Sequence, residues 1–437
     1  MAQFRSWGRY PRSEAVLYPL HWQEDPLPPT GEPMLAVGMG RSYGDVCLNH
    51  GGTLLLTRPL NRFIAFDPVA GCMTCEAGVT LGEVLDVIVP HGWFLPVTPG
   101  TQHVTVGGAI ANDVHGKNHH RAGSFGAHLQ RLALRRSDGL TYHCTATTHG
   151  DLFRATVGGL GLTGLILSAE FTLLPITSPM IAMESIRFDT LAEYFTLTRE
   201  SDAGHEYTVA WIDAASCGSK TGRGLFLRGN HAIASGGNTR PAPAARPWQI
   251  PCTMPRGLIN RTTMRCFNHL YWHRQRARRH HCEVHYRHFF YPLDGLAAWN
   301  RLYGPRGFFQ YQCVVTQPAV VEEILRWVVR SGGSSLAVLK VFGNHPAPGL
   351  LSFARPGITL ALDFPNRGHR LFSLLQTLDE LVLADNGALY PAKDARMPPR
   401  LFTASFPHWP QFVPFIDPAF SSEFWQRVTA TDKGAVS

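Results

Sequence analysis

The stretch PVTPGTQHVTVGGAIANDVHGKNHHRAGSFG, residues 96–126, places glycine-rich turns on both sides of a run of histidines. Glycine-rich stretches recur through the first 165 residues, as GMGRSYGD (38–45), PGTQHVTVGGAIANDVHGKNHH (99–120), GSFG (123–126) and VGGLGLTG (157–164). Glycine lets backbone N–H groups approach a ligand closely, and successive N–H groups in such turns form anion-binding concavities. Four clusters beside predicted strands therefore favour a dinucleotide held by backbone. None is a G-x-G-x-x-G that opens a helix with an acidic residue about 20 positions later, which disfavours a Rossmann NAD site.

The run HGKNHH at 115–120 raises the question of a metal site. A zinc site needs ligands that converge from one side, usually with cysteine or carboxylate help. His119 and His120 are adjacent and point apart in most backbone geometries, Lys117 would repel a cation, and the run holds no carboxylate. We therefore expect no metal, and instead polar side chains that present cationic and hydrogen-bonding groups to an anionic cofactor or substrate. A purely structural role for these histidines stays open.

Length and composition are those of a globular protein. The chain has 437 residues, enough for two domains with large cores, and 44% of them are hydrophobic. No apolar run reaches the roughly 20 residues of a membrane span, and the N-terminus has no signal-peptide pattern, so we expect cytoplasmic synthesis. The nine cysteines are odd in number and show no disulfide framework, and Cys72 and Cys75 form a lone C-x-x-C inside a strand pattern. We expect reduced thiols and no zinc there.

The net charge of +8 is concentrated between residues 256 and 288. This basic segment interleaves arginines, histidines and aromatic residues: Arg256, Arg261, Arg265, Arg274, Arg276, Arg278, Arg279, Arg287, His269, His273, His280, His281, His285, His288, Phe267, Tyr271 and Trp272. Such a composition can bind nucleic acid, anionic lipid headgroups or a phosphorylated ligand. A solvated, mobile loop is an equally good interpretation of composition alone.

Strand and helix patterns alternate through the first 176 residues. Thr80 and Glu83 form a capping box for a helix over 80–92, and Ser137-Asp138-Gly139 predicts a hairpin turn. Predicted strands cover 53–57, 62–66, 72–79 and 161–176. Farther along, strands are predicted at 208–216, 285–293, 308–316 and 358–365, with helices at 318–333 and 370–387 and a loop at 234–247. This order predicts an α+β fold with an antiparallel sheet covered by helices.

Five stretches closely resemble the decaprenylphosphoryl-β-D-ribose 2-oxidase family, FAD enzymes of the vanillyl-alcohol-oxidase type. They are GMGRSYGD, residues 96–126, ATVGGLGLTGLI (155–166), AWNRLYGPRGFFQYQ (298–312) and LYPAKDAR (389–396). The resemblance runs in order from about residue 5 to about residue 430. It implies a two-subdomain FAD-binding domain at 1–176, a substrate-binding domain at 177–385 with an antiparallel sheet covered by helices, and a C-terminal segment at 386–437 that returns to the FAD domain.

The resemblance also implies the site residues. The implied FAD contacts are Gly40, Arg41, Ser42, Tyr43, Gly44, Pro99, Gly100, Thr101, Gly107, His115, Gly116, Lys117, Asn118, Ser124, Gly126, Gly164, Ile166 and Tyr390. The implied substrate-side residues are Trp211, Gln312, Lys340 and Lys393. Lys393 is expected to polarise the substrate hydroxyl or the flavin, with Gln312 and His115 holding the sugar. The alternative for Lys393 is a salt bridge with the neighbouring Asp394.

The reaction that the resemblance implies is oxidation of the ribose 2-hydroxyl of a polyprenylphosphoryl-β-D-ribose to the 2-keto sugar. A partner NAD-dependent short-chain reductase would complete epimerisation to the arabinose donor for cell-envelope glycan synthesis. The basic segment would then lie at the membrane surface, as in a peripheral protein. Alternatives are an FAD-dependent oxidase of a soluble sugar, polyol or aldonolactone, and a nucleic-acid-binding flavoprotein that uses the arginines, which we do not expect.

Three positions depart from the family and its wider fold. Arg41 stands where many relatives of the fold carry a histidine bonded covalently to FAD, so dissociable FAD is expected. Ala361 replaces a cysteine of mycobacterial members, and Thr359 stands where a substrate-side asparagine is common. These departures concern the substrate side rather than hydride transfer, and thiol-directed inhibitors of the family should fail on this chain.

Overall fold

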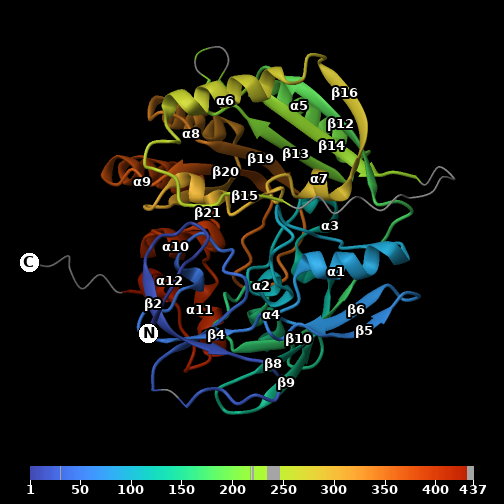
Figure 1. The fold of residues 1–437 in the computed structure, drawn as a ribbon, viewed down its shortest axis with the longest axis vertical. Helices are drawn as coiled ribbons and strands as arrows, with labels where there is room; N and C mark the ends of the chain where they lie inside the picture. The colour runs from blue at the N-terminus through green and yellow to red at the C-terminus, as the bar shows by residue number, and fades with distance from the viewer. Residues whose placement is uncertain (30, 217, 219–220, 234–246, 431–437) are drawn as a thin grey trace, which may run out of the picture.

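The computed structural model describes residues 1–29, 31–216, 218, 221–233 and 247–430. It has an α+β fold, as predicted, with two small sheets in one half and a large antiparallel sheet in the other (Figure 1). All but one residue of the loop predicted at 234–247 lie outside the described residues. Among the described residues, no helix is both long and apolar enough to cross a membrane.

The first small sheet gathers the N-terminal strands in the order β1-β2-β4-β3. The strands are β1 Ala2–Phe4, β2 Ser13–Pro19, β3 Met34–Val37 and β4 Thr53–Leu56. β4 is parallel to both of its neighbours, so β3 ends at the same edge of the sheet as β4. The first glycine-rich stretch follows β3 directly and therefore starts from that edge.

The second small sheet is antiparallel, in the order β5-β6-β10-β8-β9. Its strands are β5 Phe63–Asp67, β6 Cys72–Glu76, β8 Leu129–Arg135, β9 Thr141–Thr145 and β10 Leu165–Thr172. The predicted hairpin at 137–139 joins β8 to β9, with Gly139 at φ +81. The capping box of Thr80 and Glu83 is present, and its helix α1 spans Leu81–Ile88. A short pair of strands, β7 Trp93–Phe94 and β11 Leu174–Pro175, lies beside this sheet.

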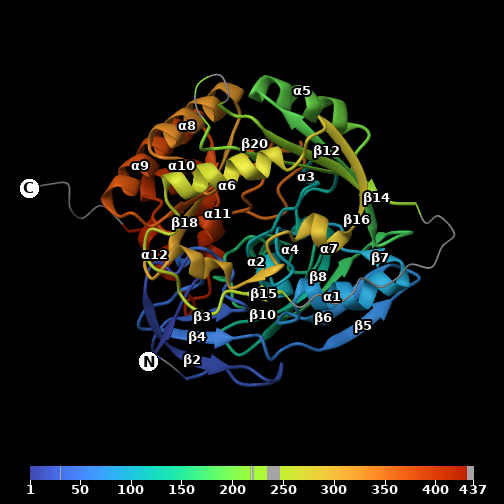
Figure 2. The same cartoon turned by 45° about the horizontal axis from the view of Figure 1, so that its top comes forward.

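The large sheet has the strand order β16-β12-β14-β13-β19-β20-β18-β21. Its strands are β12 Met180–Phe188, β13 Tyr207–Ile212, β14 Gly224–His231, β16 Arg279–His285, β18 Phe308–Val315, β19 Leu336–Phe342, β20 Gly357–Pro365 and β21 Ala388–Leu389. Helices α5 Leu191–Asp202, α8 Pro318–Arg330 and α9 His369–Ala384 pack on one face, forming an outer layer (Figure 2). This face is the largest core, and α8 buries Val321, Ile324, Leu325 and Val328 against it, as its helical spacing predicts.

The prediction of a strand over 285–293 is wrong. The strand β16 ends at His285, and helix α7 spans Tyr286–Phe290. Aromatic residues are common in strands, which explains the prediction. The same aromatics at positions 286, 289 and 290 have helical spacing, however, and α7 buries all three in the core beneath β7 and β10.

Most of the basic segment is helix or strand rather than loop. Helix α6 spans Arg261–His273, and β16 adds the next residues to the edge of the large sheet. α6 packs Trp272 against Trp211 and Leu225, on the face of the sheet opposite to α5, α8 and α9. The three buried residues of the helix, Met264, Asn268 and Trp272, recur at every fourth position. The loop interpretation failed because the charged and histidine residues between them hid this helical spacing.

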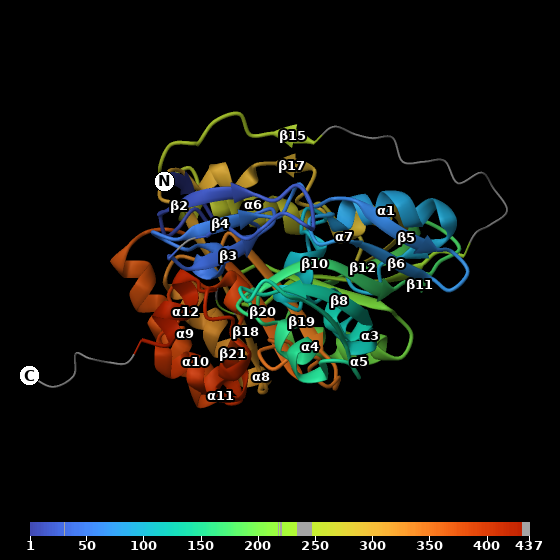
Figure 3. The ribbon, with the colours of Figure 1, turned by 90° about the horizontal axis from the view of Figure 1, so that it is seen from below.

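The C-terminal residues pack against the N-terminal ones (Figure 3). Helices α10 Pro399–Ser405, α11 Trp409–Phe412 and α12 Glu423–Val428 follow β21. Arg427 on α12 pairs with Asp45 at 2.8 Å, and Met34 and Phe420 form a parallel bridge. These contacts support the division into 1–176, 177–385 and 386–437, which stays a prediction.

The remaining elements are short. Helices α2 Val106–Ala111, α3 His119–Ala122 and α4 Gly150–Thr156 belong to the glycine-rich half, and strands β15 Trp248–Gln249 and β17 Leu296–Ala297 pair with each other. Residues 96–126 therefore contain α2, α3 and the turns that connect them. It runs from the small sheets to the large one, where the backbone N–H of Thr208 donates to the carbonyl of Lys117 at 2.9 Å.

Candidate active site

A cavity of about 1240 Å³ lies between the glycine-rich half and the large sheet. The cavity is lined from the glycine-rich half by the first glycine loop, α2 and the 98–117 segment. From the other side it is lined by β13, β18, β19, β20 and the 390–393 segment. Ligand pockets for small molecules measure about 300–1,000 Å³. The cavity is therefore large enough for a dinucleotide together with part of a second ligand.

The first glycine loop supplies backbone to the cavity wall. Gly40 has φ +58, a conformation that favours glycine. A Cβ on Gly38 would lie 2.3 Å from Oγ1 of Thr105, which accepts a hydrogen bond from the N–H of Gly108 and caps α2. Only glycine at position 38 therefore leaves both the loop and the cap of α2 undisturbed.

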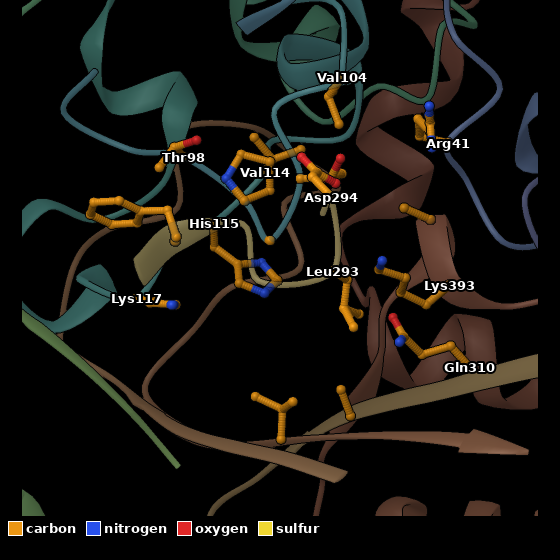
Figure 4. A pocket seen from close by; sticks show the side chains of 18 of the residues that line it. Arg41, Thr98, Val104, Val114, His115, Lys117, Leu293, Asp294, Gln310 and Lys393 are labelled. Atoms are coloured by element: carbon orange, nitrogen blue, oxygen red, sulfur yellow. The ribbon is translucent and has the colours of Figure 1, made fainter. Parts of the chain in front are cut away.

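Arg41 projects from this loop into the cavity (Figure 4). Its guanidinium lies 4.2 Å from the ring centre of Trp7, and its Nε is buried without a hydrogen-bond partner. Burial lowers the pKa of Arg41, although the nearby Asp294 opposes that shift. A buried guanidinium N–H that has no partner within the protein is suited to bind an anionic ligand.

The 98–107 segment forms the second part of this wall. The hydroxyls of Thr98 and Tyr291 hydrogen-bond at 2.6 Å, and the N–H of Gln102 donates to Oδ2 of Asp294 at 2.9 Å. The N–H of Gly107 donates to the carbonyl of Ala77 at 2.8 Å, which ties the start of α2 to the second small sheet. The loop is therefore anchored on both sides and is preorganised around the cavity.

Most of the residues predicted to contact the cofactor line this cavity. They are Gly40, Arg41, Ser42, Tyr43, Pro99, Gly100, Thr101, Gly107, His115, Gly116, Lys117, Gly164, Ile166 and Tyr390. Gly44, Asn118, Ser124 and Gly126 do not line it. Ser124 and Gly126 donate to the buried carboxylate of Asp113, each at 2.9 Å, and Asn118 donates to the carbonyl of Pro96 at 2.8 Å. These residues shape the loops from behind the wall.

His115 and Gln312 meet at the centre of the cavity. Nε2 of Gln312 donates to Nε2 of His115 at 3.0 Å and to Oγ1 of Thr359 at 3.2 Å. Burial, together with Lys340, His119 and Lys393, holds the pKa of His115 well below its usual value, so the imidazole is neutral. Its Nδ1 is buried without a protein partner. Because Nε2 accepts, the proton resides on Nδ1, which is free to donate to a ligand.

Lys393 faces the cavity from a short turn after β21, beside Gln310 (Figure 4). Its Nζ lies 3.9 Å from the ring centre of Tyr43. Burial lowers the pKa of Lys393 to about 7, while the nearby Asp363 opposes the shift. Burial also raises the pKa of Asp363 to about 7, although Gln310 donates to this carboxyl at 2.5 Å.

The alternative pairing of Lys393 with Asp394 is wrong. The carboxylate of Asp394 pairs with Arg427 at 2.9 Å and accepts from the N–H groups of Arg396 and Met397. Asp394 therefore fixes the turn that carries Lys393, and it leaves the amine directed toward the cavity.

The histidines of the run 115–120 do not converge. His119 packs against Phe342 with ring centres 4.5 Å apart, and Nε2 of His120 bonds the carbonyl of His205 at 3.2 Å. Throughout the described ranges, no group of three histidine, cysteine or acidic side chains could hold a metal ion. His119 and His120 thus make structural contacts, whereas His115 faces the cavity.

The substrate-side residues come from strands of the large sheet. Trp211 on β13, Gln312 on β18 and Lys340 on β19 all line the cavity together with Lys393. Lys340 is paired directly with Thr359 across β19 and β20, and Gln312 is paired with Ala361. The four predicted substrate residues therefore share one wall, and the two substrate-side departures from the family, Thr359 and Ala361, lie among them.

Sequence reasoning missed Gln310, Asp363 and Asp294. Gln310 and Asp363 are two residues away from Gln312 and Ala361 on the same strands, so the period of two places them on the same face. That signal could have found both residues. Asp294 follows α7 and faces Arg41, and its role depends on the helix that was predicted as a strand.

The charge of the cavity favours anionic ligands. Its described wall includes the cations Arg41, Lys117, Arg274, Arg276, Lys340 and Lys393, with Asp294 as its carboxylate. Glycine turns with a strained φ, an unpartnered guanidinium and this charge excess fit a dinucleotide that carries a pyrophosphate.

Comparisons with known proteins agree with this geometry. A family model for an FAD binding domain matches residues 29–145. Decaprenylphosphoryl-beta-D-ribose oxidase of Mycolicibacterium smegmatis is 38% identical, over 91% of this chain and 89% of the relative. An uncharacterized protein of Streptomyces coelicolor is 35% identical over 80% of this chain and 100% of the relative. L-gulonolactone oxidase of Mus musculus is 29% identical over 32% of this chain and 31% of the relative. The chain binds FAD as an oxidoreductase with a vanillyl-alcohol-oxidase-type fold, and it belongs to the decaprenylphosphoryl-beta-D-ribose oxidase family.

Proposed function

We propose that this protein oxidises the 2-hydroxyl of ribose carried on a polyprenyl phosphate and forms the 2-keto sugar. The proposal rests on one observation above all. A hydrogen-bonded chain from Thr359 through Gln312 to His115 lies in the same cavity as Lys393, beside the glycine turns of the FAD-binding half. This arrangement offers a proton acceptor and sugar-binding groups at one place.

FAD, when bound, supplies the hydride acceptor for the carbinol carbon. We assign the hydroxyl proton to the amine of Lys393, because burial brings its pKa to about 7 and makes the neutral amine accessible near neutral pH. His115 offers the N–H on Nδ1 to a hydroxyl or ring oxygen of the sugar, and Gln312 fixes the imidazole in that tautomer. Trp211 supplies an apolar wall.

The decisive experiment is anaerobic mixing of the purified holoenzyme with a prenylphosphoryl-β-D-ribose. The yellow absorbance of the oxidised flavin should bleach within a single turnover, and the product should be the 2-keto sugar. Mixing with the corresponding arabinose compound is the stereochemical control. Persistent yellow colour with the ribose substrate would overturn the proposal.

A second candidate is oxidation of a soluble sugar, polyol or aldonolactone. The similarity to L-gulonolactone oxidase favours it, although this similarity covers only 32% of the chain. A detergent-free assay with free sugars and lactones separates the two candidates. Turnover without any prenyl phosphate would favour this second activity.

We also propose that FAD is held without a covalent bond. Arg41 stands at the position where a histidine would be needed for attachment, and a guanidinium does not form that bond. Acid precipitation of the holoenzyme should therefore release all of the flavin into the supernatant. Flavin that stays with the precipitated protein would contradict this.

The keto product and the prenyl tail point to two partners, which we propose together. The first is an NAD-dependent short-chain reductase, since net epimerisation needs a hydride returned to the same carbon. Adding such a reductase with NADH should convert the keto sugar to the arabinose compound. The second is the membrane surface, which would bring the prenyl chain to the cavity.

Helix α6 supports the membrane proposal. Phe267 and Leu270 on this helix are 55% and 69% exposed, and Arg261 and Arg265 are exposed beside them. Phe267, Tyr271 and Arg274 also line the cavity, so the apolar side of α6 borders its opening. Exposed aromatic and aliphatic side chains flanked by arginines fit an anionic lipid surface.

Vesicle sedimentation tests the role of α6. The protein should sediment with vesicles that contain phosphatidylglycerol, and Phe267→Ser/Leu270→Ser should weaken this binding roughly tenfold. Val69→Ser, which changes an exposed apolar residue far from α6, is the control. Retention on heparin and DNA with a steep salt dependence would instead favour the nucleic-acid alternative.

A further inference from the structure

Lysine is rare in this chain and its placement is unusual. The sequence holds five lysines, at positions 117, 220, 340, 393 and 433, among 40 lysines and arginines. The structure describes Lys117, Lys340 and Lys393, and all three line the same cavity. Among the described residues, every lysine therefore lines this cavity, and the permanently charged cations elsewhere are arginines. Lysine differs from arginine in being a compact point charge whose pKa shifts readily on burial.

Lys117 and Lys340 lie side by side in this wall. Nζ of Lys340 donates to the carbonyl of Gly116 at 3.1 Å, so it ends beside the residue that precedes Lys117. Nζ of Lys117 donates to the carbonyl of Phe289 and lies 4.4 Å from the ring centre of that residue. The charge of Lys340 lowers the pKa of Lys117. Two ammonium groups thus approach the cavity from different elements.

Neither of these ammonium groups has a counterion within the described part of the chain. No carboxylate of those residues lies within ion-pairing distance of either one, whereas Lys393 has Asp363 nearby. Burial lowers the pKa of Lys117 to about 7 and that of Lys340 to about 8. Two half-buried cations without a counterion are costly unless a ligand brings the opposite charge.

We propose that Lys117 and Lys340 together bind the phosphodiester of the substrate, an inference that rests on the proposed function. In a ribosyl phosphate the phosphate is attached to carbon 1, next to the carbon 2 that is oxidised. The phosphate must therefore bind within a few ångströms of the reacting carbon. Lys340 meets this requirement, because it pairs across the strands with Thr359, which hydrogen-bonds Gln312.

The outer arginines do not meet this requirement. Arg274 and Arg276 line the opening of the cavity from the end of α6, where they are exposed to solvent. They are placed to attract anionic lipid, whereas the lysine pair is placed to fix the phosphate that belongs to the substrate. Lys340 lies on the large sheet, and Lys117 lies where the 98–117 segment meets β13. Arg41 of the glycine turn at 38–44, which suits the cofactor's pyrophosphate, lies on the opposite side of the cavity (Figure 4).

Proton uptake on binding follows from this arrangement. An anion between the lysines raises the pKa of both, so the bound enzyme holds more protons than the free enzyme. At pH 8 the complex should take up about one proton, and at pH 6 almost none, since both amines are then already charged. The other titratable groups that face the pair are His115 and His119, whose pKa values burial lowers, and Lys393.

The test uses the holoenzyme and two prenyl probes, one with an anionic phosphodiester and one without it. Farnesyl methyl phosphate is a phosphodiester without a sugar, and farnesyl methyl ether is its uncharged counterpart. Binding is measured by flavin fluorescence and by calorimetry in buffers of different ionisation enthalpy. The wild type should prefer the phosphodiester, and Lys117→Met and Lys340→Met should each reduce that preference roughly tenfold. Proton uptake at pH 8 should disappear in the double variant.

The controls distinguish phosphate binding by the two lysines from a general charge effect and from cofactor binding. Arg326→Met removes an exposed charge on α8, which is remote from the cavity, and should change neither the preference nor the proton uptake. FAD content should stay stoichiometric in both lysine variants, and a loss of FAD would make these lysines cofactor contacts and overturn the proposal. A phosphodiester preference that survives in the double variant would overturn it as well.

The same experiments distinguish a failure of the proposed sugar oxidation from a failure of the anion site. If prenylphosphoryl ribose does not bleach the flavin but the phosphodiester still binds through the two lysines, the anion site stands and the sugar assignment falls. If the flavin bleaches normally in the double variant, with an unchanged KM, the sugar assignment stands and the anion site falls.

Discussion

The two walls of the cavity present different kinds of groups to it. The glycine-rich wall, residues 38–44 and 98–108, presents backbone groups held in tight turns, and its side chains are mostly small. The large-sheet wall presents side chains, with Trp211, Gln312 and Lys340 projecting from three separate strands. Backbone can hold a common cofactor without specifying much sequence, whereas side chains are needed to select a particular substrate.

The two walls also differ in how far apart their residues lie in the sequence. Residues of the glycine-rich wall are close together in the sequence, because one turn supplies several N–H groups. Residues of the large-sheet wall are far apart, because neighbouring strands such as β13 and β19 are separated by more than a hundred residues of sequence. Substitutions in the two walls should therefore fail differently, the first through loss of FAD and the second through loss of turnover with FAD retained.

The largest effect should come from Lys393→Met in the large-sheet half. Methionine keeps most of the apolar stem but removes the amine that we assign to the hydroxyl proton. The rate of flavin reduction in anaerobic stopped flow should fall by a factor of about 10²–10⁴. FAD content should not change, and a variant that reduces its flavin at the normal rate would remove Lys393 from the chemistry.

Gly38→Ala tests the opposite wall and should act through the cofactor. The added Cβ would lie 2.3 Å from Oγ1 of Thr105 and would displace the cap of α2. Overpacking of this kind costs about 1–3 kcal/mol, so FAD should bind roughly tenfold to a hundredfold more weakly. FAD per protein after gel filtration measures the effect. Gly204→Ala, where a Cβ meets nothing within 4 Å, is the matched control.

The contrast explains how much the sequence alone could predict. The α1 capping box, the 137–139 turn and the α8 helix depend on neighbouring residues, and all three were predicted correctly. The glycine clusters likewise led to a dinucleotide from local pattern. By contrast, α7 was predicted as a strand, because burial against a distant core decides the state of an aromatic-rich segment.

Residues of the large-sheet wall could not be assembled from pattern alone. Gln312, Lys340 and Lys393 became candidates only through the family resemblance, since nothing local connects three polar residues on separate segments. The pairing of Gln310 with Asp363 was missed for the same reason, because it depends on strand register. The small number of lysines is visible in the sequence, but it points to a site only once the fold shows the described lysines in one cavity.

Gln312→Leu should have an intermediate effect in the large-sheet wall. Leucine removes the amide that donates hydrogen bonds to Nε2 of His115 and Oγ1 of Thr359. The imidazole therefore loses its fixed tautomer and its orientation. Each unsatisfied buried group costs about 1–3 kcal/mol, and we expect KM for the prenylphosphoryl ribose to rise roughly tenfold. Gln376→Leu on the exposed side of α9 is the control. Loss of FAD in Gln312→Leu would mean that the two walls are not separable.

The smallest effect is the pH dependence of flavin reduction. If neutral Lys393 accepts the hydroxyl proton, the rate should rise with pH through about 7, because the amine loses its own proton there. Between pH 6.5 and 7.5 the increase should be about threefold. Burial and the charge of Lys340 lower the pKa of Lys393, whereas the carboxylate of Asp363 raises it. Asp363→Asn should therefore move the midpoint of the pH profile to lower pH. A rate that falls as pH rises through 7 would instead assign the protonated amine, and it would give Lys393 the role of stabilising negative charge on the cofactor.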